Sequence, residues 1–250
     1  MLKTILYSLI LSSVMYAISN KELATKNDMV MSGFQDSTSD MYMTLVNASG
    51  QERKRKMKMS VLEKEGGDKS LMEFLSPADV KGTKFLSYSH IEKDDDQWLY
   101  IPALKRIKRI ASKNKSGSFM GSEFSYEDLS SMDVEKYSYS GDAKKVKYGA
   151  KESYKGERTP KSSNSGYTKQ VFWTDAKNFL TLKVDYYDRK HALFKTATFS
   201  DYKKISGVWR VGKMMMLNHQ NDKKTILLWK NENIKNGLKE KDFHKRMLRP

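Results

Sequence analysis

One stretch of the chain combines the residue types needed to bind a partner that is both anionic and apolar. Between Asp94 and Leu129 basic and aromatic residues are interleaved, and no acidic residue falls within 97–122. Lysine and arginine supply charge for phosphate or carboxylate groups, while the aromatic rings supply apolar area. The predicted chemistry is noncovalent contact with a ligand or a membrane. The candidate contact residues are Trp98, Tyr100, Lys105, Arg106, Lys108, Arg109, Phe119, Met120, Phe124 and Tyr126.

The second half of this stretch is a predicted loop, residues 113–122, whose apolar tip is Phe119-Met120. Gly117 and Gly121 flank the tip and are expected to act as hinges, because glycine adopts backbone conformations that other residues avoid. With nearby lysines the glycines would also suit a backbone nest for an anion, although a plain flexible loop explains them equally well. We expect the tip to act as a gate or as a point of membrane contact.

Catalytic and metal-binding motifs are incomplete. Gly207–Met214 approaches a phosphate-binding loop, but Met214 stands where that motif needs Ser or Thr, in an alternating strand context. Ser116–Ser122 lacks a nucleophile elbow because Phe119 holds the serine position. The run Asp94–Asp96 lacks the alternation of a calcium loop and is interpreted as a solvated turn. The histidines are scattered, which argues against a zinc site. Because no catalytic or cofactor motif is complete, we predict no enzymatic activity, no cofactor and no metal.

Composition restricts the partners. The 250 residues include 46 Lys and Arg against 30 Asp and Glu, which gives a formal net charge of +16. This balance favours nucleic acid, a membrane surface or acidic lipid headgroups, although solubility or a basic proteome explains it as well. The chain has no cysteine. Disulfides, thiol catalysis, thiolate metal sites and lipid attachment to an N-terminal cysteine are therefore excluded.

The N-terminus has the pattern of a secretory signal peptide, predicted over residues 1–19. Lys3 is the only charge before Lys21, and Ile5–Ile18 is almost entirely apolar or small. The apolar run is shorter than the roughly 20 residues of a membrane span. An uncleaved anchor or a buried helix is the alternative. Export would place the protein in a periplasm and argues against nucleic acid as the partner.

The spacing of apolar residues predicts a mainly β chain. A short amphipathic helix is expected over Lys21–Phe34, and after Asp36 the period changes from three or four residues to two. Polar residues at Glu157–Gly166 predict a mobile loop. The expected strands are Met41–Val46, Arg53–Leu62, Ser70–Leu75, Phe85–Ser89, Gln97–Ile101, Arg106–Ile110, Tyr126–Leu129, Val134–Tyr139, Ala150–Ser153, Thr168–Trp173, Leu180–Tyr187, Leu193–Asp201, Val208–Leu217 and Thr225–Asn231.

No composition change divides these strands, so residues 20–250 are predicted to form a single domain. Strands and helices do not alternate, which indicates an antiparallel sheet. The chain is rich in adaptable apolar residues, with 15 Met, 14 Tyr and 10 Phe. They favour a curved sheet around a cavity. An ordinary core with methionine as filler fits the same composition.

Three long blocks of sequence occur in order at Ser76–Thr83, Asp95–Arg106 and Lys115–Tyr126, with shorter segments at Leu182–Asp188, Met216–Gln220 and Phe243–Pro250. Together they resemble the signature of a bacterial family of outer-membrane lipoprotein-sorting proteins, relatives of the Lol-type periplasmic lipoprotein carriers. The resemblance implies a half-open antiparallel β-barrel with a small helical lid and an apolar cavity for acyl chains. It also implies a periplasmic location and association with inner-membrane lipid exporters.

We therefore expect a monomeric periplasmic carrier or chaperone for lipids or lipid-modified proteins. Its basic residues would hold anionic headgroups or dock the carrier on an anionic membrane, and Trp98 and Tyr100 would lie near the cavity mouth. The alternative is an envelope adaptor that binds a transporter and carries no lipid. A filled core would favour the adaptor, and an empty apolar cavity would favour the carrier. A secreted enzyme would need clustered, buried titratable groups in a cleft.

Overall fold

The structure is a computed structural model and describes residues 17–249. The predicted signal peptide, 1–19, lies almost wholly outside that range. The helix is α1 (Asn20–Met31). The strands are β1 (Asp36–Val46), β2 (Glu52–Leu62), β3 (Lys69–Ser76), β4 (Lys84–Tyr88), β5 (Asp96–Ile101), β6 (Arg106–Ile110), β7 (Tyr137–Ser138), β8 (Lys144–Tyr148), β9 (Lys151–Pro160), β10 (Lys169–Asp175), β11 (Thr181–Tyr187), β12 (Leu193–Ser200), β13 (Lys203–Ile205), β14 (Val208–Arg210), β15 (Lys213–Asn218) and β16 (Lys224–Ile234). Short 3-10 turns are η1 (Pro102–Leu104), η2 (Ser112–Asn114), η3 (Glu127–Leu129), η4 (Val134–Lys136), η5 (Glu240–Phe243) and η6 (Lys245–Leu248).

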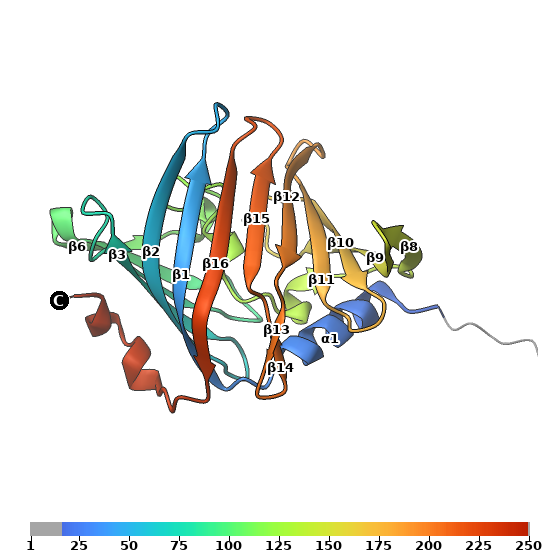
Figure 1. Cartoon of the computed structure of the whole chain (residues 1–250), viewed down its shortest axis with the longest axis horizontal. Helices are drawn as coiled ribbons and strands as arrows, with labels where there is room; N and C mark the ends of the chain where they lie inside the picture. Colours follow the sequence, from blue (N-terminus) through green and yellow to red (C-terminus); the bar gives the residue numbers. More distant parts are fainter. Residues whose placement is uncertain (1–16, 250) are drawn as a thin grey trace, which may run out of the picture.

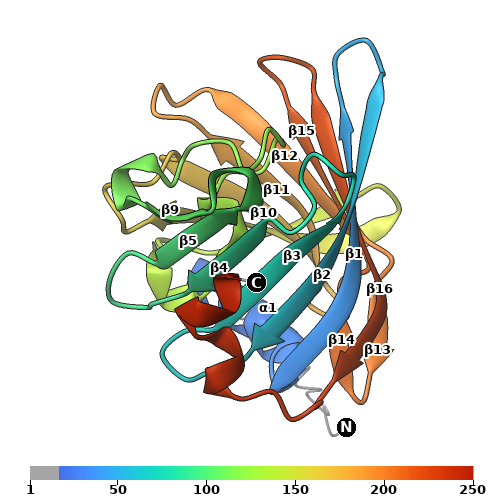
Figure 2. The same cartoon turned by 90° about the vertical axis from the view of Figure 1, so that its left-hand side faces the viewer.

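Fourteen strands form one antiparallel sheet (Figure 1). Its order is β6-β5-β4-β3-β2-β1-β16-β15-β12-β11-β10-β9-β7, with β8 paired to β9, while β13 and β14 form a separate hairpin. The first and last long strands, β1 and β16, therefore pair in the middle of the sheet. The sheet curves strongly, and its end strands β6 and β7 do not pair within the described range (Figure 2). The mainly β, half-open antiparallel architecture predicted from the sequence is confirmed.

Methionine dominates the concave face of the sheet. Met41 and Met43 of β1 are 1% and 0% exposed, and Met57 of β2 and Met72 of β3 are equally buried. Met41 lies opposite Met57 in the β1–β2 register. An unbranched, flexible side chain can fill the irregular space that a strongly curved sheet leaves. The composition therefore reflects the curvature of the sheet.

Helix α1 and short turns cover part of the open side. The helix begins after Ser19, whose hydroxyl accepts a hydrogen bond from the N–H of Glu22 at 3.1 Å. Leu23 and Ala24 are buried in the same core cluster as the methionines. The helix contacts β9, β14 and η4. It corresponds to the expected helix at Lys21–Phe34, shortened at its C-terminal end, and forms the small lid.

The C-terminal segment, residues 238–249, covers the opposite face of β3, β4 and β5 (Figure 2). Phe243 and Leu248 are fully buried there against Trp98 and Tyr100. This second core is separate from the concave one. Both faces at this end of the sheet are thus closed by the chain itself.

The structure corrects four predicted elements. Tyr126–Leu129 forms turn η3, and the predicted strand at Val134–Tyr139 is turn η4 followed by the short β7. Val208–Leu217 is two strands on either side of Gly212, β14 in the separate hairpin and β15 in the large sheet. The first residues of the predicted loop at Glu157–Gly166 belong to strand β9. There the buried Arg158 side chain donates a hydrogen bond to the side chain of Gln170, so this part of the strand lacks the apolar alternation by which strands are predicted.

Replacing Phe243 with Ala is expected to lower the free energy of unfolding by about 3–5 kcal/mol, because a fully buried ring leaves a cavity. Met247→Ala, at a side chain that is 40% exposed, is the matched control and should change it by less than about 0.5 kcal/mol. Urea unfolding followed by tryptophan fluorescence measures both. Equal values for the two variants would show that the C-terminal segment does not pack as described.

Candidate functional site

A hairpin loop from the open side folds into the concave face. We call residues 116–126 the plug. Its backbone is closed by hydrogen bonds from the N–H of Phe119 to the carbonyl of Phe124 at 2.8 Å and from the N–H of Tyr126 to the carbonyl of Gly117 at 3.1 Å. The turn uses a positive φ of 74° at Gly121, a conformation that glycine adopts without strain. The loop is therefore a compact structure.

The aromatic residues of the plug fill the space inside the sheet. Phe119 and Phe124 are 0% and 1% exposed. The Phe119 ring lies 5.1 Å from that of Phe85, 5.6 Å from that of Tyr126 and 6.0 Å from that of Phe74, centroid to centroid. The buried Phe119 ring faces inward and does not offer the membrane contact expected of the tip, while its role as a gate stays a prediction. The apolar ring faces an apolar concave surface and gains more by burial than by exposure.

Three polar contacts hold the plug on the sheet. Arg55, whose side chain points inward from β2, donates from Nη1 to the carbonyl oxygen of Met120 at 2.7 Å. The N–H of Glu123 donates to Oγ1 of Thr225 at 3.0 Å, and Nδ2 of Asn218 donates to Oε2 of Glu123 at 2.7 Å. Burial lowers the pKa of the Arg55 guanidinium. These contacts join the plug to strands β2, β15 and β16.

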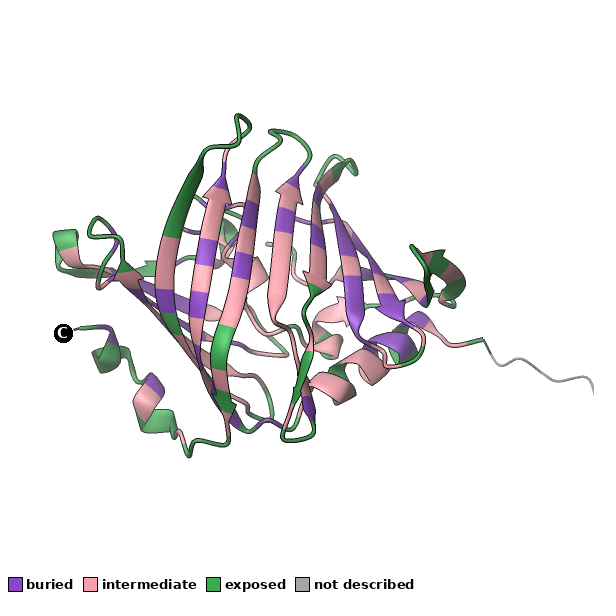
Figure 3. Ribbon diagram, in the orientation of Figure 1, coloured by how far each residue is buried: buried purple, intermediate pink, exposed green. Residues whose placement is uncertain are grey.

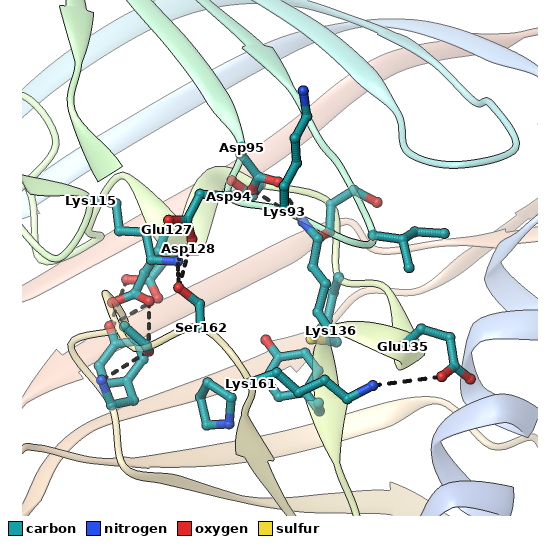
Figure 4. Close-up of a pocket in the computed structure, with 18 of the residues that line it drawn as sticks. Lys93, Asp94, Asp95, Lys115, Glu127, Asp128, Glu135, Lys136, Lys161 and Ser162 are labelled. Atoms are coloured by element: carbon teal, nitrogen blue, oxygen red, sulfur yellow. Dashed lines mark hydrogen bonds and ion pairs between the residues drawn. The ribbon is translucent and has the colours of Figure 1, made fainter. Parts of the chain in front are cut away.

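A cavity of about 700 Å³ lies beside the plug, on the open side of the sheet (Figure 4). We call it the mouth pocket. Three loops bound it, at residues 91–95, 127–136 and 160–167, and they bring together lysines, carboxylates and tyrosines. The residues labelled in Figure 4 are Lys93, Asp94, Asp95, Lys115, Glu127, Asp128, Glu135, Lys136, Lys161 and Ser162.

Asp94 organises one wall of the mouth pocket. Its Oδ1 accepts hydrogen bonds from Lys115 Nζ at 2.9 Å and Ser162 Oγ at 2.6 Å, and its Oδ2 accepts one from Asn164 Nδ2 at 2.7 Å. Burial alone would raise the pKa of Asp94, but these three donors together hold it at about 2. The bonds tie the root of the plug at Lys115 to two other loops.

A second ion pair lies on the neighbouring wall. Lys136 Nζ is 2.9 Å from Oδ1 of Asp95 and 3.2 Å from the carbonyl oxygen of Ser131. Both charged side chains are less than one-fifth exposed. The acidic run interpreted from sequence as a solvated turn is thus part of a half-buried ionic network, and that interpretation is wrong.

The floor of the mouth pocket joins it to the concave core. Tyr167 Oη donates to Oδ1 of Asp128 at 2.9 Å, and its ring lies 4.8 Å from that of Tyr186. Both tyrosines are also members of the concave core cluster. Burial, and next the charge of Asp128, raise the pKa of Glu127, which accepts bonds from Ser165 and Gly166. Burial also raises the pKa of both tyrosine hydroxyls, so they stay protonated donors.

The predicted contact residues fall into separate places. Trp98 and Tyr100 alternate with Leu99 on β5 and face the outer side, under the C-terminal segment. Their expected position near the cavity mouth is wrong. Phe124 and Tyr126 lie in the plug, and Gly117 and Gly121 at its base and turn, so the structure brings together Phe119, Met120, Phe124 and Tyr126 but not the β5 aromatics.

The basic cluster lies on β6, an end strand of the sheet. Arg106 and Lys108 pair opposite Ile101 and Leu99 and so share the concave-side row. Both are exposed. Lys105 occupies the turn before β6, and Arg109 points outward and pairs with Asp96 at 2.5 Å. Only part of the cluster therefore borders the open side.

Sequence reasoning missed Arg55 and the charged wall formed by Asp94, Lys115, Asp95 and Lys136. Arg55 follows Arg53 and Lys54 in a strand of basic residues, so nothing in its local pattern marks it as inward-facing. The partners of Asp94 come from loops far along the chain, beyond what spacing can reveal. The acidic run itself was the only available signal.

Two other searches were negative. In residues 17–249, no group of three His, Asp or Glu side chains is arranged to hold a metal ion. In the same range no helix has the length and apolar character to cross a membrane.

The open antiparallel sheet of this chain is similar in fold to a solved protein of the LolA superfamily. A LolA superfamily protein from Nitrosomonas europaea superposes with a TM-score of 0.74 over 92% of this chain and all of its own, at 17% identity. That likeness concerns the fold alone.

Closer similarity identifies the family. A putative outer membrane lipoprotein-sorting protein domain from Vibrio parahaemolyticus is 47% identical, with a TM-score of 0.85 over 91% of this chain and 97% of its own. A DUF1329 family protein from Desulfovibrio piger is 33% identical, with a TM-score of 0.86 over 92% and 98%. A family model described as an uncharacterized protein matches residues 66–250. No curated protein matched. The chain belongs to the outer-membrane lipoprotein-sorting family.

Asp94→Asn is expected to remove much of the acid sensitivity of the fold. Because the folded-state pKa of Asp94, about 2, lies below its ordinary value of 3.8, its ionised form stabilises the protein above about pH 4. That contribution is lost as the pH falls through about 2. The thermal unfolding midpoint of the variant should be lower at pH 7 and should fall less between pH 4 and 2.

Asp79→Asn, at an exposed side chain, is the control and should follow the unaltered protein at every pH. An identical fall for the Asp94 variant and the unaltered protein would contradict the role given to this network.

Proposed function

We propose that this protein is a non-enzymatic periplasmic carrier or chaperone for lipids or lipid-modified proteins, and that acyl chains bind the concave face in place of the plug. The observation that carries the proposal is the burial of Phe119 and Phe124 on an apolar surface that the sheet itself leaves open. The family and its lipoprotein-sorting relatives support it. An inner-membrane exporter would supply the cargo.

The energetics favour an exchange between plug and cargo. Burying a methylene group contributes about 0.8 kcal/mol, so one long acyl chain supplies several kcal/mol without any covalent step. The plug buries two phenylalanine rings on the same surface, and cargo must replace that gain. Such competition lowers the apparent affinity in proportion to the population of the plug-out state. A carrier that must release its cargo benefits from this reversibility.

The mouth pocket and the β6 edge would receive the polar part of the cargo. The floor tyrosines Tyr167 and Tyr186 belong to both the pocket and the concave core, so a molecule could place its chain inside and its headgroup in the pocket. Arg106 and Lys108, on the concave-side row of β6, would attract an anionic headgroup. These assignments retain two of the four basic residues that the sequence selected, Arg106 and Lys108.

An envelope adaptor that carries no lipid is the second candidate. The specific observation in its favour is that the concave face is filled by the plug. The two functions differ in acyl binding: a carrier exchanges its plug for an acyl chain, whereas an adaptor keeps a permanent core.

Arg55→Met should strengthen acyl binding, because it removes the donor to the Met120 carbonyl while keeping an apolar side chain of similar reach. A hydrogen bond from a charged group contributes about 1.5–3 kcal/mol, so the dissociation constant for a fluorescent fatty acid should fall about tenfold or more. Titration followed by fluorescence measures it.

The control is Lys54→Met, at an exposed neighbour on β2, which should bind the probe as the unaltered protein does. Binding that is unchanged or weaker in a folded Arg55 variant would refute the exchange of plug for cargo. Absence of acyl binding in every variant would favour the adaptor.

A double variant, Arg106→Gln with Lys108→Gln, should weaken binding of a fatty acid about 25-fold and leave a monoacylglycerol of equal chain length unaffected. Each charge near an anionic group contributes about 1 kcal/mol. The matched control is Lys144→Gln with Lys147→Gln, at two exposed lysines of β8 away from the β6 edge, and it should bind both probes as the unaltered protein does. A parallel loss for both probes would mean that these residues act on the fold and not on the headgroup.

A further inference from the structure

The convex face of the sheet carries an apolar patch in the middle of β1, β15 and β16. Successive residues of a strand point to opposite faces of the sheet. Met43, Leu227 and Met216 are buried on the concave side, so the residues next to them in sequence point to the convex side. We call the outward group the convex patch. It comprises Tyr42, Met215, Leu217, Ile226 and Leu228.

The register makes the patch continuous. Tyr42 of β1 lies opposite Leu228 of β16, and Ile226 of β16 lies opposite Met215 of β15. All five side chains are partly exposed, and none belongs to either core cluster of residues 17–249. In Figure 1 these strands lie in the foreground, and neither α1 nor the C-terminal turns cross them. Figure 3 shows the intermediate exposure along their middle portions.

Lysines border the apolar centre on its β2 side and along β15 and β16, while threonines of β12 line the remaining side. Lys56 lies opposite Tyr42 on β2, Lys213 lies opposite Leu228 on β15, and Lys230 follows on β16. The Nζ atoms of Lys56 and Lys230 lie 5.8 Å and 5.6 Å from the centroid of the Tyr42 ring. Lys54 and Lys58 extend this positive border along β2, and Lys224 extends it at the start of β16.

Acidic residues offset little of this charge. Glu52 pairs with Lys54 at 3.2 Å, and Asp40, beside Lys58 and Lys230, accepts a hydrogen bond from Asn231 at 2.8 Å. Within the described range, Lys56, Lys213 and Lys230 form no salt bridge. The patch therefore offers a surplus of positive charge at its centre.

We propose that the convex patch docks the protein on an anionic phospholipid bilayer. A partly exposed apolar centre can enter the interfacial layer, a tyrosine is favoured at that depth, and long lysine stems reach the surrounding phosphates. The inference goes beyond the proposed function and does not depend on it. Docking by this face turns the open side away from the bilayer, so cargo would arrive from a protein partner on that side.

Sedimentation with sucrose-loaded vesicles tests this assignment. The unaltered mature chain should bind vesicles of phosphatidylglycerol and phosphatidylcholine and should not bind phosphatidylcholine alone, and added salt should weaken the binding. The triple variant Lys56→Gln, Lys213→Gln and Lys230→Gln should lose about 100-fold in partition coefficient, since each lysine near an anionic surface contributes about fivefold.

The charge-matched control is Lys144→Gln, Lys145→Gln and Lys147→Gln, three exposed lysines of β8 away from the patch, which should bind the anionic vesicles as the unaltered protein does. Equal losses in both triple variants would mean that net charge alone drives binding and would overturn the assignment. A normal partition coefficient for the convex variant, or no preference of the unaltered protein for anionic vesicles, would overturn it as well. Circular dichroism of each variant confirms the fold.

Discussion

The burial of Phe119 inside the curved sheet is the interaction on which the rest of the architecture depends. A sheet whose end strands do not pair cannot enclose its own concave face, so some other group must cover it. Here the plug does so, with its ring in contact with side chains of β3 and β4. The same packing that completes the fold occupies the surface on which an acyl chain would bind.

Polar groups decide how firmly the plug is held. Arg55 binds its turn, and the Asp94–Lys115 pair fixes its root beside the mouth pocket. The turn is thus held by a few hydrogen bonds, while the root is held by a network that includes loops from distant parts of the chain. This division suits a hinge at the root and a mobile tip. The plug and an acyl chain both gain free energy by burying apolar surface on the concave face. A small change in the polar contacts of the plug would therefore shift the equilibrium between plug and acyl chain.

The outer face of the sheet is covered at one end and uncovered along its middle strands. The C-terminal segment closes the outer side of β3 to β5 with Phe243 and Leu248, and no comparable segment among residues 17–249 covers the middle strands. Lysines border the uncovered area instead. The curvature of the sheet therefore separates the concave face proposed to bind cargo from the convex patch proposed to dock on a bilayer.

The strand pattern could be predicted because period-two alternation is local: β6 was predicted with its observed bounds, and the strands from β10 to β12 within two residues. Which face of β5 points to the concave side could not be predicted. Both faces are apolar, with Leu99 on one and Trp98 and Tyr100 on the other, so alternation alone does not distinguish them. The inward course of the plug depends on contacts with β3 and β4, which no spacing within residues 116–126 records.

The most direct test of the central claim is a distance measurement between plug and sheet. The chain has no cysteine, so Ser118→Cys and Thr198→Cys would be its only spin-labelling sites, one on the plug and one on the outer side of β12. Without lipid, electron–electron double resonance should give one narrow distance. Saturation with a fatty acid should lengthen and broaden it. An unchanged distance in protein that has bound the fatty acid stoichiometrically would contradict the account.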